Sequence, residues 1–106
     1  MTVGRVKVAA LDDVPMNGNK AFKINGRSIL LCKSDAGVFA LENRCSHMFA
    51  ELEGGRVRGA YLFCPKHSVR FDMRTGASGG TLTKVPLQTF AVTVAADGNI
   101  EIDWPE

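Results

Sequence analysis

The chain contains the segment Cys45-Ser46-His47 and, after sixteen further residues, the segment Cys64-Pro65-Lys66-His67. Two of its three cysteines and both of its histidines fall in these two short segments. Two thiolates and two imidazoles are a sufficient ligand set for a metal, and each pair is spaced so that one turn of chain can direct both side chains at the same point. The sequence therefore predicts a metal site built by two loops, with the rest of the chain holding those loops face to face.

Three interpretations of these four residues compete. They could be unrelated buried cysteines and satisfied histidines, although their repeated Cys-then-His order argues against chance. They could bind a structural zinc ion, but zinc fingers usually take both cysteines from one knuckle and both histidines from a helix. They could also bind an iron–sulfur cluster in which one iron takes two cysteines and the other takes two histidines. The interleaved order favours the third interpretation, since each loop then gives one ligand to each iron.

Working outward, short strands separated by turns account for most of the chain. The clearest signal is Asn25-Gly26 between the apolar segments 21–24 and 27–31, because this dipeptide tolerates positive φ at both central positions of a type I′ turn. Further strands are expected over residues 3–10, 38–41, 69–72, 87–94 and 100–102, with loops at 11–19 and 77–83 and a single helical turn near 49–53. The pattern predicts an all-β protein, an antiparallel sandwich or barrel that the last hairpin closes.

The composition is that of one globular domain. A chain of 106 residues can bury one core but not two, and 45% hydrophobic with 23% charged residues is ordinary for a globular protein. The formal charge of +2 is spread along the chain, which argues against nucleic-acid binding. No apolar run reaches the roughly 18 residues of a membrane span, and no secretory signal is recognisable. We therefore expect a cytoplasmic protein with no membrane partner.

The remaining candidates have structural explanations. Cys32 ends the apolar run that begins at Ile29 and is expected to be a buried, unreactive thiol, since free cysteine behaves as a small hydrophobe. Met48 and Phe49 are expected to shield the metal site, and Trp104 to pack near the end of the chain. An odd number of cysteines does not support a disulfide framework.

The spacing Cys45-x-His47 with Cys64-x-x-His67 resembles the Rieske [2Fe–2S] motif, and the chain is similar to the Rieske-type ferredoxins of bacterial ring-hydroxylating oxygenase systems. The resemblance implies one [2Fe–2S] cluster per chain, with Cys45 and Cys64 on the inner iron and His47 and His67 on the outer iron. It also implies a single Rieske domain over residues 1–106. In that domain a cluster-binding subdomain of short strands and two ligand loops, about 43–72, is inserted in a basal β domain (1–42 and 73–106).

By this resemblance the protein is an electron-transfer component and not an enzyme. It would take one electron at a time from a flavin-dependent reductase and deliver it to a terminal aromatic-ring oxygenase. Two alternatives stay open: a Rieske-like small subunit of another oxidoreductase such as nitrite reductase, and a zinc-stabilised interaction module.

Departures from the pattern of high-potential respiratory Rieske proteins place the chain within the family. Those proteins carry an extra cysteine in each loop, where this chain has Ala50 and Lys66. They also carry serine and tyrosine hydroxyls that donate to cluster and cysteine sulfurs, where this chain has Val69 and Phe71. Because such donors stabilise the reduced, more negative cluster, their absence predicts a potential near the bottom of the Rieske range, about −150 mV.

Basic residues near the expected site suggest a role in partner docking. Lys66 lies beside His67, and Arg44 precedes Cys45. Charge complementarity acts mainly on the encounter rate, so these two residues could steer an acidic partner, although they could equally be solvated surface charges.

Overall fold

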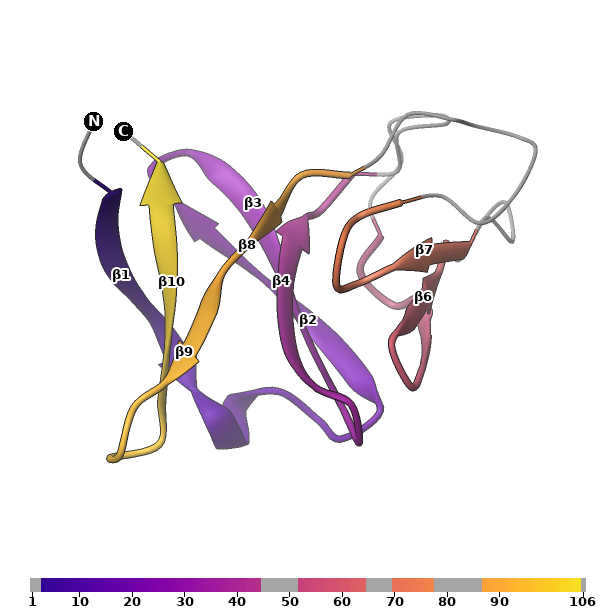
Figure 1. The fold of residues 1–106 in the computed structure, drawn as a ribbon, viewed down its shortest axis with the longest axis horizontal. Coiled ribbons are helices and arrows are strands. Elements are labelled where there is room, and N and C mark those ends of the chain that lie inside the picture. The colour runs from indigo at the N-terminus through magenta and orange to yellow at the C-terminus, as the bar shows by residue number, and fades with distance from the viewer. Residues whose placement is uncertain (1–2, 45–51, 65–69, 78–86, 106) are drawn as a thin grey trace.

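The structure is a computed structural model and describes residues 3–44, 52–64, 70–77 and 87–105. Within these ranges the chain forms three small antiparallel sheets, with one 3₁₀ turn, η1 (Leu11–Asp13), after the first strand. Figure 1 shows the sheets following one another along the long axis of the molecule. No helix in the described ranges is long and apolar enough to cross a membrane. The predicted all-β antiparallel fold is confirmed.

The first sheet joins the two ends of the described chain. Its strand order is β1 (Val3–Ala10), β10 (Asn99–Pro105) and β9 (Val92–Val94). Val6 lies opposite Ile102 and Lys7 opposite Glu101, and the register shifts after Lys7. The expectation that the last hairpin closes the structure begun by the first strand is therefore confirmed.

The second sheet contains the hairpin that the sequence signals most clearly. Its order is β2 (Gly18–Ile24), β3 (Arg27–Ser34), β4 (Gly37–Glu42) and β8 (Thr89–Phe90). Asn25 and Gly26 have φ values of 50° and 82°, as a type I′ turn requires. The pairing of β2 with β3 extends from this turn to Gly18, which lies opposite Lys33. The loop expected at 11–19 is thus shorter than predicted.

The third sheet is made of three-residue strands: β5 (Arg56–Arg58), β6 (Tyr61–Phe63) and β7 (Arg70–Asp72). Val57, Leu62 and Phe71 lie opposite one another on its inward face and are at most 4% exposed. The sequence pattern predicted β7 but did not locate β5 and β6, because three-residue strands show too little alternation.

The second sheet forms the middle layer, and this explains the apolar run at its centre. Ile29 and Leu31 of β3 pack with Ile100 and Trp104 on the first-sheet side. Leu30 and Cys32 point the other way and join a second core. Its members from the third sheet and the segments beside it are Leu52, Val57, Leu62, Cys64, Phe71 and Met73. A strand buried on both faces needs apolar residues at consecutive positions rather than alternate ones. Full burial also raises the pKa of the Cys32 thiol to about 12, so it is the inert thiol predicted.

One predicted strand was wrong in its extent. The sequence indicated a single alternating strand over 87–94, but the structure divides this segment at Ala91. Phe90 pairs with Ala40 in the second sheet, whereas Val92 pairs with Ile102 in the first. The chain passes from the second sheet to the first at this point, so the side of the chain that faces the core changes. The alternation of residues 87–94 therefore does not correspond to one continuous strand.

Candidate metal centre

Of the four predicted ligands, Cys64 is described, while Cys45, His47 and His67 lie outside the described residues. Cys64 directly follows β6 and is 3% exposed. It belongs to the same apolar core as Leu52, Leu62 and Phe71. The structure thus places this thiol at the inner side of the third sheet, away from solvent.

The segment 64–69, here called the second ligand loop, connects two paired strands. Phe63 at the end of β6 lies opposite Arg70 at the start of β7. Adjacent strands are about 4.8 Å apart, so the loop leaves and returns at nearly the same place. This connection carries Cys64 and, three residues on, His67.

The first ligand loop, residues 44–51, is closed by one side chain. Asn43 Oδ1 accepts hydrogen bonds from the backbone N–H groups of Leu52 and Glu53, both at 2.9 Å. Asn43 Nδ2 donates to Ser28 Oγ at 3.0 Å, and the Asn43 backbone N–H donates to the Ser28 carbonyl at 3.0 Å. Asn43 is itself 6% exposed. The two ends of this loop are therefore joined to each other and to β3.

The bases of the two loops touch. A Cβ atom added to Gly55 would collide with the carbonyl oxygen of Phe63, the residue before Cys64, and would lie 3.0 Å from the Leu52 carbonyl oxygen. Asn19 of β2 fixes this turn, because its Oδ1 accepts from Gly54 N–H and its Nδ2 donates to the Gly55 carbonyl, each at 2.8 Å. The prediction that the rest of the chain holds the two loops together agrees with these contacts at their bases.

Carboxylates around the loop bases are engaged in structural hydrogen bonds. Glu42 Oε1 accepts from Gln88 N–H at 3.0 Å, and Glu53 Oε2 from Ala21 N–H at 2.8 Å. The guanidinium of Arg74 hydrogen-bonds the Asp72 carboxylate and lowers its pKa. Arg44 is exposed, whereas Lys66 lies outside the described residues. Steering by these two basic residues stays a prediction.

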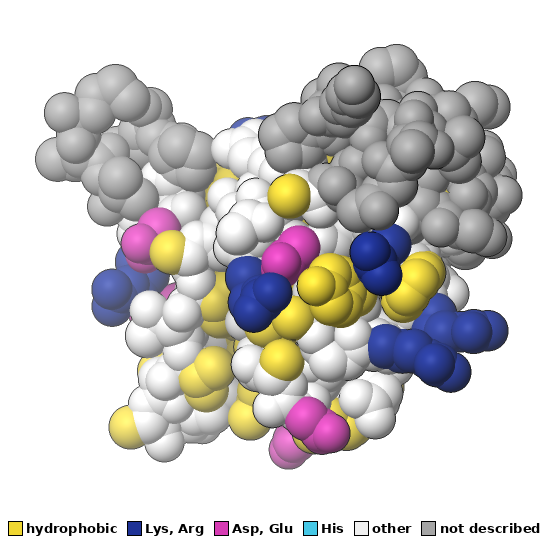
Figure 2. Space-filling model, turned by 45° about the vertical axis from the view of Figure 1, so that its right-hand side comes forward, with side chains coloured by type: hydrophobic (Ala, Val, Ile, Leu, Met, Phe, Trp, Pro, Cys, Tyr) yellow, Lys and Arg dark blue, Asp and Glu magenta, His cyan; other side chains and the backbone are white. Residues whose placement is uncertain are grey.

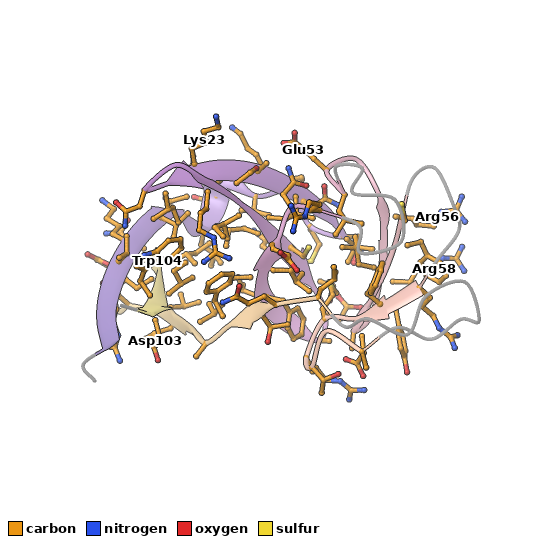
Figure 3. All side chains as sticks on the ribbon, turned by 90° about the horizontal axis from the view of Figure 1, so that it is seen from above. Lys23, Glu53, Arg56, Arg58, Asp103 and Trp104 are labelled. Atoms are coloured by element: carbon orange, nitrogen blue, oxygen red, sulfur yellow. The ribbon has the colours of Figure 1, made fainter. Side chains whose placement is uncertain are left out.

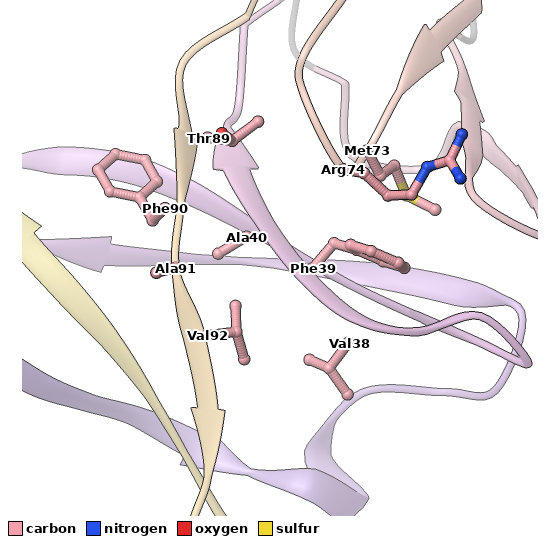
Figure 4. A pocket seen from close by; sticks show the side chains of 9 residues that line it. All are labelled: Val38, Phe39, Ala40, Met73, Arg74, Thr89, Phe90, Ala91 and Val92. Atoms are coloured by element: carbon pink, nitrogen blue, oxygen red, sulfur yellow. The ribbon is translucent and has the colours of Figure 1, made fainter.

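A groove of about 390 Å³ lies beside β4, where the chain runs from β8 into β9 (Figure 4). It exists because β8 pairs with β4 only at Ala40 and Leu41, after which β9 joins the other sheet. Its lining is largely apolar and contains no cysteine, histidine or carboxylate: Val38, Phe39, Ala40, Met73, Arg74, Thr89, Phe90, Ala91 and Val92. The groove thus offers no second metal site. Beside it, Phe90 stacks on Trp104 with ring centroids 5.5 Å apart, which confirms the predicted packing role of Trp104.

The donor set and its setting fit an iron–sulfur cluster. Thiolates bind iron–sulfur clusters, and imidazoles can replace two of them on one iron. The apolar surroundings of Cys64 restrict solvent access to that side of the site. The contacts of Asn43, Asn19 and Gly55 could not be predicted from the sequence, because most of their partners are backbone groups that only the fold brings near. The fold and the site together define a small all-β iron–sulfur protein.

Comparisons with known proteins give the family. A profile of the Rieske [2Fe-2S] domain matches residues 4–91. The chain is 32% identical over 94 residues to the ferredoxin component of the naphthalene 1,2-dioxygenase/salicylate 5-hydroxylase systems of Ralstonia sp, covering 89% of this chain and 90% of that protein. It is 33% identical over 100 residues to the 3-phenylpropionate/cinnamic acid dioxygenase ferredoxin subunit of Photorhabdus laumondii, covering 93% of each. The chain belongs to the Rieske [2Fe–2S] family, and its cofactor is one [2Fe–2S] cluster.

Solved structures agree with this assignment. The ferredoxin of carbazole 1,9a-dioxygenase from Nocardioides aromaticivorans IC177 superposes with a TM-score of 0.85 at 31% identity, covering 96% of this chain and 98% of that one. A ferredoxin solved in complex with the oxygenase of carbazole 1,9a-dioxygenase gives 0.82 at 25% identity, covering 93% and 92%. A nitrite reductase small subunit from Mycobacterium tuberculosis gives 0.85, covering 100% and 99%, but at 18% identity it shows a shared fold alone.

Proposed function

We propose that this protein is the ferredoxin component of a ring-hydroxylating dioxygenase system. It receives electrons from a flavoprotein reductase and delivers them to a terminal oxygenase, so it is a carrier and not itself an enzyme. The observation that carries the proposal is the match in length as well as in sequence: the relatives named ferredoxin components align over about nine tenths of both chains. The bound cluster supplies one-electron redox chemistry. The nitrite reductase alternative is less supported, because it rests on the shared fold.

We further propose Cys45, His47, Cys64 and His67 as the cluster ligands, with residues 43–72 as an inserted cluster-binding subdomain. The buried position of Cys64 and the closed bases of both loops support this assignment. Cys32 is not among the proposed ligands, because it lies within the paired strand β3 and in neither ligand loop. A cytoplasmic location belongs to the same proposal, since the carrier must meet two separate proteins, and cell fractionation tests it.

The ligand assignment predicts different outcomes for two buried cysteines. Cys64→Ala should abolish the visible absorption and the reduced-state EPR signal of the purified protein, whereas Cys32→Ala should retain both. The same loss is expected for alanine at Cys45, His47 or His67. A wild-type protein that stays colourless and EPR-silent after anaerobic reconstitution with iron and sulfide would remove the electron-carrier proposal. Colour retained by Cys64→Ala would instead overturn the ligand set.

The cluster potential provides a second test. Phe71 is fully buried in the same apolar core as Cys64, and its ring carries no hydroxyl that could donate to a sulfur. We therefore expect a midpoint potential of about −150 mV, near the bottom of the Rieske range. Protein-film voltammetry measures it directly, and a value near the upper end of that range, about +300 mV, would contradict the prediction drawn from Val69 and Phe71.

A further inference from the structure

The outward face of the third sheet is lined with arginine and aromatic side chains. Because β5, β6 and β7 pair in register, Arg56, Phe63 and Arg70 form one outward row. Arg58, Tyr61 and Asp72 form the next row. These six residues are called the arginine face below. Figure 3 shows Arg56 and Arg58 extending from the sheet at the opposite end of the molecule from Trp104.

Among the residues that the structure describes, no carboxylate compensates the positive charge of the three arginines. Arg56, Arg58 and Arg70 are exposed, and none forms an ion pair with a residue that the structure describes. The single carboxylate of the face, Asp72, is held by Arg74 through hydrogen bonds of 3.0 and 2.9 Å. Within the described part of the chain, the face therefore carries three arginines that have no carboxylate partner. Figure 2 shows dark-blue side chains gathered on the side of the molecule where Figure 1 places β6 and β7.

One arginine of the face lies against an aromatic ring. The Arg70 guanidinium lies 5.0 Å from the centroid of the Tyr61 ring, which is a cation–π contact. Tyr61 is nevertheless 37% exposed, and it is one of the few exposed large hydrophobic residues in the described part of the chain. Tyrosine and arginine are the residues that protein interfaces enrich and that dominate binding energy. The face therefore has the composition of a protein-binding surface.

The position of the face adds a geometric argument. Phe63 and Arg70 are the two residues that flank the second ligand loop. Three strands of three residues span only about 10 Å by 7 Å, far less than the roughly 800 Å² per partner of a standard interface. A partner bound here must extend onto neighbouring surface, and the adjoining loop is part of the proposed cluster site. Binding on this face thus brings a partner close to the redox centre.

We propose that the arginine face docks a carboxylate-rich surface of the terminal oxygenase. The inference rests on the proposed function and names where the acceptor binds. The oxygenase is chosen over the reductase because a ferredoxin similar to this chain has been solved in complex with its oxygenase. Uncompensated arginines attract an acidic surface over distances of the Debye length, about 30 Å at 0.01 M salt and 10 Å at 0.1 M, so the attraction should depend strongly on salt.

The test compares two double charge reversals of equal magnitude. Arg56→Glu/Arg58→Glu changes the arginine face, and Lys7→Glu/Lys23→Glu changes two exposed lysines on β1 and β2. Each cluster-loaded protein is titrated against the immobilised oxygenase that accepts electrons from the wild-type ferredoxin, and separately against the reductase. We expect the arginine variant to bind the oxygenase at least about tenfold more weakly at 0.01 M salt, with the difference shrinking at 0.1 M. The lysine variant should bind as the wild type does.

Several results would overturn the proposal: unchanged binding of the arginine variant, an equal loss in the lysine variant, or a loss seen with the reductase alone. Gel filtration showing a wild-type dimer that the arginine substitutions dissociate would assign the face to self-association instead. Arg56→Gln/Arg58→Gln removes charge without reversing it and should give an intermediate affinity. If no oxygenase accepts electrons from the wild type, the proposed function fails, and this outcome is distinct from a failure of the docking proposal.

Discussion

Asn43 holds the first ligand loop through groups that no sequence pattern connects. Its partners are backbone groups nine and ten residues later, and Ser28 fifteen residues earlier. The sequence places Asn43 two positions before Cys45. It does not show that the side-chain amide acts both as a hydrogen-bond acceptor and as a donor. This role depends on β3 and β4 lying side by side.

Replacing Asn43 should therefore affect both stability and cluster retention. Asn43→Ala leaves the N–H of Leu52, a fully buried residue, without its acceptor, and we expect the free energy of unfolding to fall by about 1–3 kcal/mol. Cluster release, followed by loss of visible absorption in denaturant, should become faster.

Asn43→Asp is the matched control for that change. A carboxylate retains both acceptor contacts to Leu52 and Glu53 and loses the donor to Ser28, so its effect should be clearly smaller than that of alanine. Equal effects of the two substitutions would show that the acceptor contacts do not hold the loop.

At the level of elements, the turn between Leu52 and β5 joins the two loop bases, and its two glycines have different reasons to be glycine. Gly54 has φ of +90° and open space where a Cβ would lie. Gly55 has no positive φ, but its Cβ would meet the backbone of Phe63. Gly54 is therefore required by the backbone conformation, and Gly55 by the lack of space for a side chain.

The two alanine substitutions should consequently differ. Gly54→Ala should cost about 1–2 kcal/mol of unfolding free energy, the penalty of a left-handed backbone, and leave the reduced-state EPR spectrum unchanged. Gly55→Ala should cost about 1–3 kcal/mol and also shift the EPR spectrum or speed cluster loss, because it displaces Phe63 and hence Cys64. If both variants keep the wild-type spectrum, the contact between the loop bases does not position the ligand.

Strands were predictable where local chemistry determines them. Asn25-Gly26 fixes its hairpin through φ alone, and Val6 and Val8 are more buried than their neighbours Arg5 and Lys7, as alternation predicts. The division at Ala91 was not predictable, because it arises from pairing with strands more than forty residues away in one sheet and with β10 in the other. Local alternation carries no information about such a change of partner.

For the whole molecule, the four candidate ligands and the fold class followed from the sequence, because two Cys/His pairs and a chain of short strands leave few alternatives. The three-layer arrangement did not. The apolar run from Ile29 to Cys32 reflects this arrangement, because all four residues are buried. Periodicity alone, however, cannot distinguish a strand buried on both faces from other buried segments. The distribution of charge over the arginine face likewise needed the register of β5, β6 and β7.

The core around Cys64 is shared between layers, since Leu30, Cys32 and Leu41 of the middle sheet pack with Leu62 and Phe71 of the third. The proposed cluster-binding subdomain is therefore expected to need the middle sheet in order to fold. Recombination between related ferredoxins that exchanged residues 43–72 would also have to exchange the matching face of β3 and β4. Chimaeras made in the laboratory should also exchange both sides of this core together. Segments that pack only in the first-sheet core should be exchangeable on their own.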